Sequence, residues 1–188
     1  MRLLGIIIFG VIFQARILIA QPFSSIEIGS SISNSTIQDK SYSDRWYAEN
    51  KFSLSISTPF YVGHLRAYFD LIKYEELPNV PVGFNTKNYA LGLVHRFSLN
   101  HFLYVDLGGN FGIQEIAQDV PNVTSDSIER ELFFGGVLEP GFQTKYVLFY
   151  ASLEYRKIYF YERQHIYFLG GGMRFKLHIP ERIKRLID

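Results

Sequence analysis

The stretch Val147–Arg156, read as VLFYASLEYR, alternates from Phe149 onward between apolar and polar positions. Successive side chains of a β-strand point to opposite faces, so this period of two predicts an amphipathic strand. One face carries Val147, Phe149, Ala151, Leu153 and Tyr155, and the other carries Tyr150, Ser152, Glu154 and Arg156.

Seven further segments show the same alternation, which gives eight predicted strands between residues 26 and 176. The connections between them alternate in length. The short ones are Thr58–Phe60, Ser98–His101 and Glu139–Gly141, and the long ones are residues 34–45, 75–86, 115–127 and 157–164. Long loops at one end and short turns at the other indicate an all-β fold, an eight-stranded antiparallel up-and-down barrel.

The composition limits the function. The chain has 188 residues, enough for one domain. Its 19 basic and 18 acidic side chains nearly balance, which gives no sign of nucleic-acid binding. It has no cysteine, which excludes disulfides, thiolate metal sites, a cysteine nucleophile and a lipid-modified cysteine.

The first twenty residues have the pattern of a secretory signal peptide. Arg2 supplies the positive start, Leu3–Phe13 is an unbroken apolar run, and Ala20 is a plausible cleavage position. An uncleaved anchor is the alternative, but this apolar run is too short to span about 30 Å of hydrocarbon. We therefore expect residues 1–20 to be a signal peptide, residues 21–177 the barrel, and residues 178–188 a short periplasmic tail.

The residue types on the two faces favour a membrane over water outside the barrel. The polar face is rich in Gly and Ser with scattered charges, which suits a narrow interior. The apolar face is rich in Leu, Phe and Ile, and tyrosines lie near its ends, as in proteins that cross a membrane interface. These tyrosines are Tyr47, Tyr61, Tyr89, Tyr146, Tyr155 and Tyr167. A soluble lipocalin-like binder, with the apolar face turned inward, is the alternative.

The segment from about Phe23 to Leu177 resembles the small outer-membrane barrel class typified by OmpA and OmpX. The aromatic runs Tyr146–Tyr150 and Ile158–Tyr161 are similar to those of Bacteroidota-type porin-like barrels. The resemblance implies a monomer in the outer membrane of a Gram-negative bacterium, in contact with lipid and lipopolysaccharide and inserted by the barrel-assembly machinery. Many such barrels end on an aromatic residue, whereas thirteen residues follow Phe175 here.

Charged side chains fall on the predicted inner face in nearly equal numbers of each sign. The acids are Glu27, Glu49, Asp70, Asp106, Glu131 and Glu154, the bases are Lys51, Arg66, Arg96, Arg156, Arg174 and Lys176, and His64 joins them. The interior of an eight-stranded barrel is just wide enough for side chains, and charges there must pair. We expect a plug of ion pairs, with a narrow transport channel as the alternative.

No catalytic, cofactor or metal site is predicted. Some small outer-membrane barrels modify lipid A, and one such family carries a His two residues before a Ser; the segment His165-Ile166-Tyr167 lacks that Ser. His64 with Ser53 or Ser55 and Asp70 would supply a base, a nucleophile and an acid. Such a set would make the protein an enzyme, but the main expectation is a structural or surface-interaction role.

Overall fold

A computed structural model describes residues 23–78, 83–118, 129–159 and 163–179. The predicted signal peptide and the tail beyond residue 179 lie outside these residues. Within the described part of the chain, no helix is long and apolar enough to cross a membrane.

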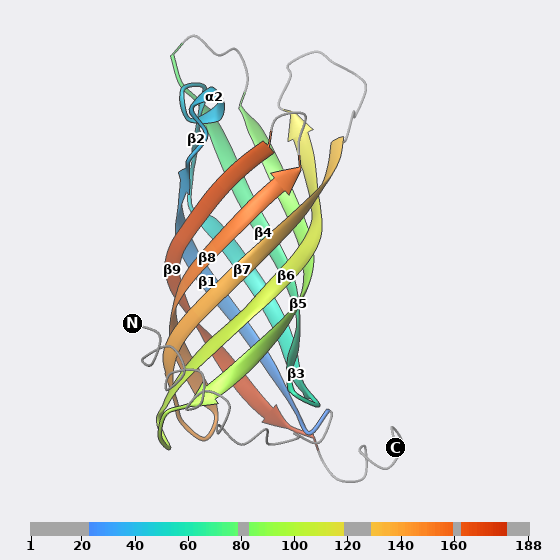
Figure 1. Cartoon of the computed structure of the whole chain (residues 1–188), viewed down its shortest axis with the longest axis vertical. Coiled ribbons are helices and arrows are strands. Elements are labelled where there is room, and N and C mark those ends of the chain that lie inside the picture. The colour runs from blue at the N-terminus through green and yellow to red at the C-terminus, as the bar shows by residue number, and fades with distance from the viewer. Residues whose placement is uncertain (1–22, 79–82, 119–128, 160–162, 180–188) are drawn as a thin grey trace, which may run out of the picture.

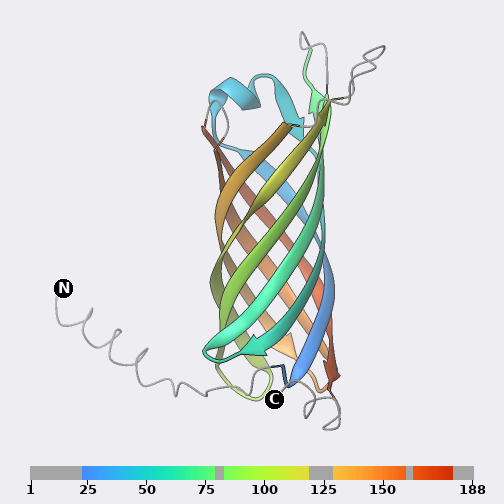
Figure 2. The ribbon, with the colours of Figure 1, turned by 90° about the vertical axis from the view of Figure 1, so that its right-hand side faces the viewer.

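Eight long strands form one closed antiparallel barrel (Figures 1 and 2). They are β1 (Ser25–Ile37), β3 (Lys51–Phe60), β4 (Gly63–Glu76), β5 (Phe84–Ser98), β6 (Leu103–Gln118), β7 (Glu129–Gln143), β8 (Val147–Tyr159) and β9 (Arg163–His178). Each strand pairs with its neighbours in sequence, and β1 pairs with β9 to close the ring. The predicted up-and-down barrel is therefore confirmed.

The short turns gather at one end, which we call the turn end, and the other end is the loop end (Figure 1). Residues 61–62, 99–102 and 144–146 connect strands at the turn end. At the loop end, the chain between β1 and β3 contains the short helix α2 (Lys40–Ser43) and the short strand β2 (Trp46–Ala48). Strand β2 pairs with the last residues of β4 and extends the wall there. The connection from β8 to β9 is shorter than predicted, since β9 begins at Arg163.

The prediction of a turn at Glu139–Gly141 is wrong. These residues lie within β7 and pair with β6, with Pro140 opposite Val105. Pro140 has no N–H to donate, and the regular pairing of β7 with β8 is interrupted at Glu139 and Pro140 before it resumes in the same register at Gly141. The strand continues because Leu138, Pro140 and Phe142 all keep to the outer face.

The ring closes through glycines of β9. Gly170 lies opposite Ser33 of β1. A Cβ atom at Gly170 would lie 2.1 Å from the carbonyl oxygen of Ile32 and 2.5 Å from the Cα of Ser33, so a side chain there would push β1 away. Glycine at this position lets the first and last strands approach closely.

Candidate functional site

The candidate site is the interior of the barrel, where buried ionic side chains form two clusters. The turn-side cluster contains three acids and three arginines: Glu27, Arg66, Arg96, Asp106, Glu139 and Arg174. The loop-side cluster contains Lys51, Asp70, Glu154 and Arg156. Each cluster is balanced in formal charge, which is the condition under which ionic groups tolerate removal from water.

Asp106 and Arg96 are the centre of the turn-side cluster. The Arg96 guanidinium donates to both carboxylate oxygens of Asp106, at 2.8 and 2.9 Å. It also donates to both carboxylate oxygens of Glu27, at 2.7 and 3.1 Å. Such bidentate contacts match the planar geometry of the guanidinium group and hold it in one orientation.

Two further arginines share the same acids. Arg66 donates to Asp106 at 3.0 Å and to Glu139 at 2.8 Å, and its side chain is fully buried. Arg174 donates to Asp106 at 3.4 Å and also to Glu139. The guanidinium carbon of Arg174 lies 3.9 Å from the centre of the Tyr150 ring, a cation–π contact. Asp106 therefore accepts hydrogen bonds from three arginines.

The loop-side cluster links four strands. Arg156 of β8 donates to Glu154 of the same strand at 2.5 Å, and to Asp70 of β4. Lys51 of β3 donates to Glu154, and Asn110 of β6 donates to the other oxygen of that carboxylate at 3.1 Å. These contacts cross the interior and join its opposite walls.

A small polar cavity separates the two clusters. Its volume is about 10 Å³, close to the smallest space that holds one water molecule. Serines of β1, β3 and β8 line it together with Tyr68, Glu139 and Glu154. Side chains of both clusters, Glu139 and Glu154, thus face this cavity.

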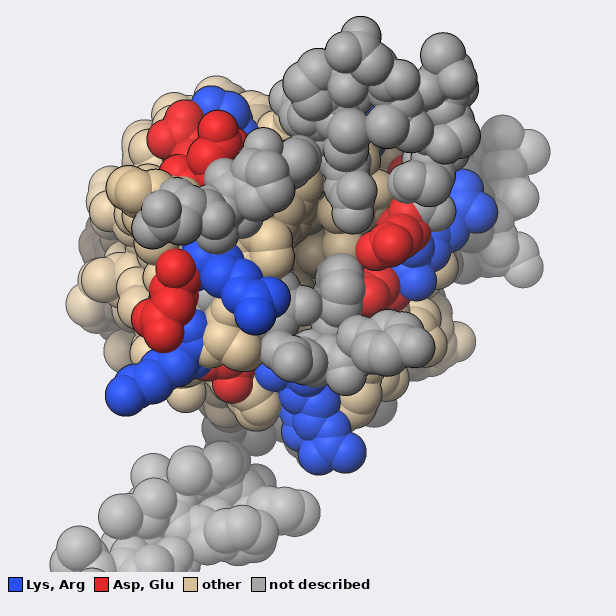
Figure 3. All heavy atoms as spheres, turned by 90° about the horizontal axis from the view of Figure 1, so that it is seen from above, with Lys and Arg blue, Asp and Glu red and all other residues tan. Residues whose placement is uncertain are grey.

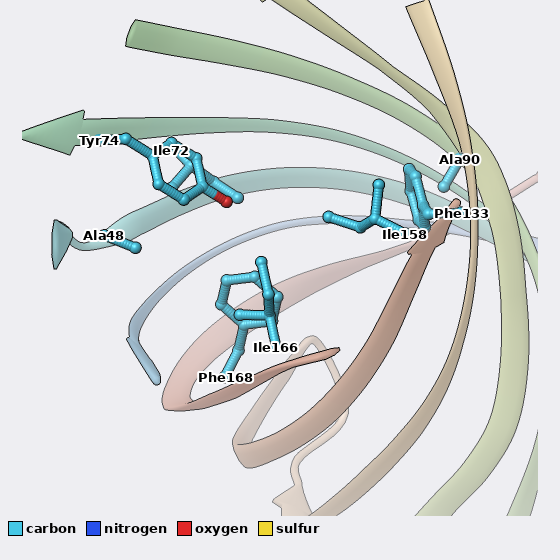
Figure 4. Packing of buried hydrophobic residues seen from close by; sticks show 8 residues of the cluster. All are labelled: Ala48, Ile72, Tyr74, Ala90, Phe133, Ile158, Ile166 and Phe168. Carbon is cyan, nitrogen blue, oxygen red and sulfur yellow. The ribbon is translucent and has the colours of Figure 1, made fainter. Parts of the chain in front are cut away.

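A cluster of buried apolar side chains, which we call the apolar layer, lies inside the barrel on the loop side (Figure 4). Its members come from six strands: Ala48, Ile72, Tyr74, Ala90, Phe133, Ile158, Ile166 and Phe168. Cations of the loop-side cluster lie against its rings. The Nζ of Lys51 is 4.4 Å from the centre of the Phe168 ring, and the guanidinium carbon of Arg156 is 4.6 Å from that of Phe133.

Nine of the thirteen residues predicted on the inner face lie in the two clusters. His64, Glu131 and Lys176 lie outside them, and each is only half-buried. Glu49, also expected inside, is at the loop-end rim, with its carboxylate 3.5 Å from the ammonium of Lys73. The sequence reasoning missed Glu139, because Pro140 and Gly141 beside it were interpreted as a turn.

The alternative catalytic set is not assembled by the strand register. His64 lies opposite Pro59, near the turn end of β4. Ser53 lies opposite Asp70, and Ser55 lies opposite Tyr68, both farther toward the loop end. Asp70 itself pairs with Arg156 rather than with the histidine.

The outer face of the barrel is an apolar band bordered by charges at the loop end. Leu107 and Phe111 of β6 are 51% and 55% exposed, and every other barrel strand presents similar side chains. Beyond the band, Arg130 of β7 donates to Glu115 of β6 at 2.9 Å. Seen from the loop end, acidic and basic side chains are interspersed around the rim (Figure 3).

No protein-family model matches the chain, and no curated protein matches it by sequence. Solved structures do match. Neisserial surface protein A aligns with a TM-score of 0.54 and 14% identity over 82% of this chain and 96% of that one. The outer membrane protein OprG of Pseudomonas aeruginosa aligns with a TM-score of 0.51 and 9% identity over 85% of this chain and 99% of that one. The outer membrane protein Ail of Yersinia pestis aligns with a TM-score of 0.50 and 21% identity over 79% and 99%.

The closed ring of eight antiparallel strands and these alignments define the class of fold. It is the fold of the small eight-stranded outer-membrane barrels. The predicted resemblance to that class is therefore confirmed at the level of the fold.

Proposed function

We propose that this chain is a monomeric barrel of the bacterial outer membrane, closed along its axis by its own side chains, with a structural or surface-interaction role. In this proposal the turn end faces the periplasm and the loop end faces the outside, as short turns and longer loops do in outer-membrane barrels. Residues 1–20 act as the signal peptide, and the partners are lipid, lipopolysaccharide and the barrel-assembly machinery.

One observation carries the proposal: the distribution of apolar and charged side chains is the reverse of that in a soluble protein. Large apolar side chains cover the outside, whereas arginines and carboxylates such as Arg66, Arg174 and Asp106 are fully buried inside. A soluble protein rarely exposes an apolar patch of more than a few hundred Å². A closed barrel also satisfies its own backbone hydrogen bonds, which hydrocarbon requires of any structure that spans it.

The contents of the interior support the closed form of the proposal. Among the described residues, two ion-pair clusters and an apolar layer lie in the lumen, and the cavity between the clusters is about 10 Å³. Ions would need a continuous polar path, and the apolar layer around Phe133 and Phe168 interrupts one. The favoured role is therefore a scaffold that presents its loop end at the cell surface.

Membrane fractionation combined with heat-modifiable gel mobility tests the location. The full chain, expressed with residues 1–20 in a Gram-negative host, is expected in the outer-membrane fraction. The unboiled protein is expected to migrate differently from the boiled protein, because the folded barrel resists detergent. Recovery in the soluble periplasm, without such a shift, would contradict the proposal.

A charge on the outer band gives a depth-dependent prediction. Leu107→Arg, near the middle of the band on β6, is expected to lower the free energy of unfolding in lipid vesicles by about 2–4 kcal/mol. Ala117→Arg lies on the same outer face of β6, beyond the charged Glu115, and is expected to change it by about 0–1 kcal/mol. Urea titrations of both variants, followed by tryptophan fluorescence and gel mobility, measure the difference. Equal effects would show that lipid does not surround the band.

A further inference from the structure

An apolar groove lies on the outer face of the barrel at the turn end, across β6, β7 and β8. Its volume is about 550 Å³, within the roughly 300–1,000 Å³ of small-molecule sites. The outward side chains that line it are Leu103, Val105, Pro140, Phe142, Phe149 and Ala151. The lining is almost wholly apolar, and Leu99 from the turn between β5 and β6 lies at its edge.

Small residues form the floor of this groove, and rings form one wall. Pro140 and Ala151 occupy outward positions where other strands place Leu or Phe. The rings of Phe142 and Phe149 stack beside them, with centres 4.9 Å apart and planes 20° apart. Pairing between β7 and β8 is interrupted at Pro140, so the floor coincides with a break in the ladder. The hollow therefore follows from the residues themselves.

The end of the groove at the turns is held in a fixed shape and carries positive charge. The amide of Gln143 donates to the carbonyl of Phe102 at 2.7 Å, which ties two neighbouring turns together. Lys145 is exposed in the turn between β7 and β8, with its Nζ 5.1 Å from the centre of the Tyr146 ring. The amide of Lys176 donates to the carbonyl of Tyr146 at 2.7 Å, which holds the backbone of this turn against β9.

We propose that this groove binds one acyl chain of an anionic phospholipid of the periplasmic leaflet, and that Lys145 contacts its phosphate. The proposal rests on the proposed function, because only a membrane barrel with its turn end toward the periplasm places the groove in that leaflet. An apolar groove with a cation at its turn end fits the two parts of a phospholipid in order, the acyl chain and the phosphate. A free phosphate would leave the apolar lining unused, and a neutral hydrocarbon would leave Lys145 unused.

The test uses the folded barrel in phosphatidylcholine nanodiscs that contain a trace of phosphatidylglycerol with a diazirine on one acyl chain. After illumination, peptide mass spectrometry locates the cross-links. They are expected to concentrate on the groove segments of β7 and β8 rather than on the rest of the band. Ala151→Phe fills the floor and is expected to lower that labelling at least about tenfold, as displacement of roughly two buried methylene groups would. Ala67→Phe, an outward small-to-large change on β4, is the matched control and leaves the labelling unchanged.

A second pair of variants tests the phosphate contact. Lys145→Gln is expected to reduce the preference for phosphatidylglycerol over phosphatidylcholine by about fivefold, the effect of one cation near a membrane surface. Lys157→Gln, at the loop end of β8, is the control and leaves the preference unchanged. If the barrel inserts and shows heat-modifiable mobility but is labelled evenly around its outer face, the lipid site alone is overturned. Labelling that Ala151→Phe does not reduce would overturn the lipid site in the same way. A chain that fails to insert at all would overturn the proposed function and this site together.

Discussion

Replacing Asp106 with alanine is expected to lower the free energy of unfolding of the barrel by about 3–5 kcal/mol, the range for removing one partner of a buried ion pair. The carboxylate of Asp106 accepts hydrogen bonds from Arg66, Arg96 and Arg174. Without it, two acids face three arginines in a fully buried cluster. The arginines cannot lose their protons, so the excess charge has no way to neutralise.

Urea titration in lipid vesicles measures this loss, with gel mobility to show that each variant starts from the folded state. Asp106→Asn keeps the shape of the side chain and part of its hydrogen bonding. It is expected to lower the free energy of unfolding nearly as much as Asp106→Ala, because the amide lacks the negative charge that balances the arginines. Arg130→Ala, which removes a mostly exposed partner of Glu115, is the control and is expected to have little effect. An Asp106→Ala barrel as stable as the parent would show that the cluster is solvated rather than buried.

Removing Phe133, Glu139 and Arg174 together is expected to turn a closed barrel into a conducting one. Glu139→Ser with Arg174→Ser deletes one acid and one base, so that the turn-side cluster keeps two of each, and Phe133→Ser opens the apolar layer. The loss of three large side chains widens a lumen that is otherwise only just wide enough for side chains. In planar bilayers the parent is expected to give no resolved conductance steps, and the triple variant is expected to give frequent ones at the same protein concentration.

The matched control is the double variant Glu115→Ser with Arg130→Ser, which removes an acid and a base that pair on the outer face. It changes the same numbers of charges without widening the lumen and is expected to remain silent. Resolved steps from the parent itself would mean that the clusters gate a channel rather than fill it. Silence of the triple variant would show that these three side chains are not what closes the lumen. Steps from Glu139→Ser with Arg174→Ser alone would show that the apolar layer around Phe133 and Phe168 is no barrier to ions.

The period of two was enough to predict the strands and the topology. In a closed sheet, a run such as Leu103–Phe111 determines which side chains point outward, because a shift of one residue in the register would move every side chain to the opposite face. The same alternation places Arg66, Asp106 and Glu154 inside without knowledge of their partners. Which acid meets which base depends on the strand register and on contacts across the lumen, and these are not present in any local pattern.

Two errors have different origins: the first is a local signal that the tertiary structure overrides, and the second is a general expectation about the lumen. Pro140 and Gly141 are turn residues by type, but here the outward alternation of Leu138, Pro140 and Phe142 continues through them and keeps Glu139 inside. The apolar layer was missed because a lumen was expected to be polar. The sequence Leu132–Phe134 does indicate it, because three successive apolar residues place apolar side chains on both faces of one strand.

The pairing of β1 with β9 has a consequence for how the chain matures. Every other pairing among the eight barrel strands joins strands that follow one another around the barrel in chain order, but this one joins the first and the last, from Ser25 opposite His178 to Ile37 opposite Ile166. Until the final strand arrives, the growing sheet has two open edges and an exposed apolar face, which are the features that promote aggregation. Contacts between distant parts of a chain also form slowly. A nascent chain of this kind depends on protection in transit, and its last strand sets the moment at which that protection can end.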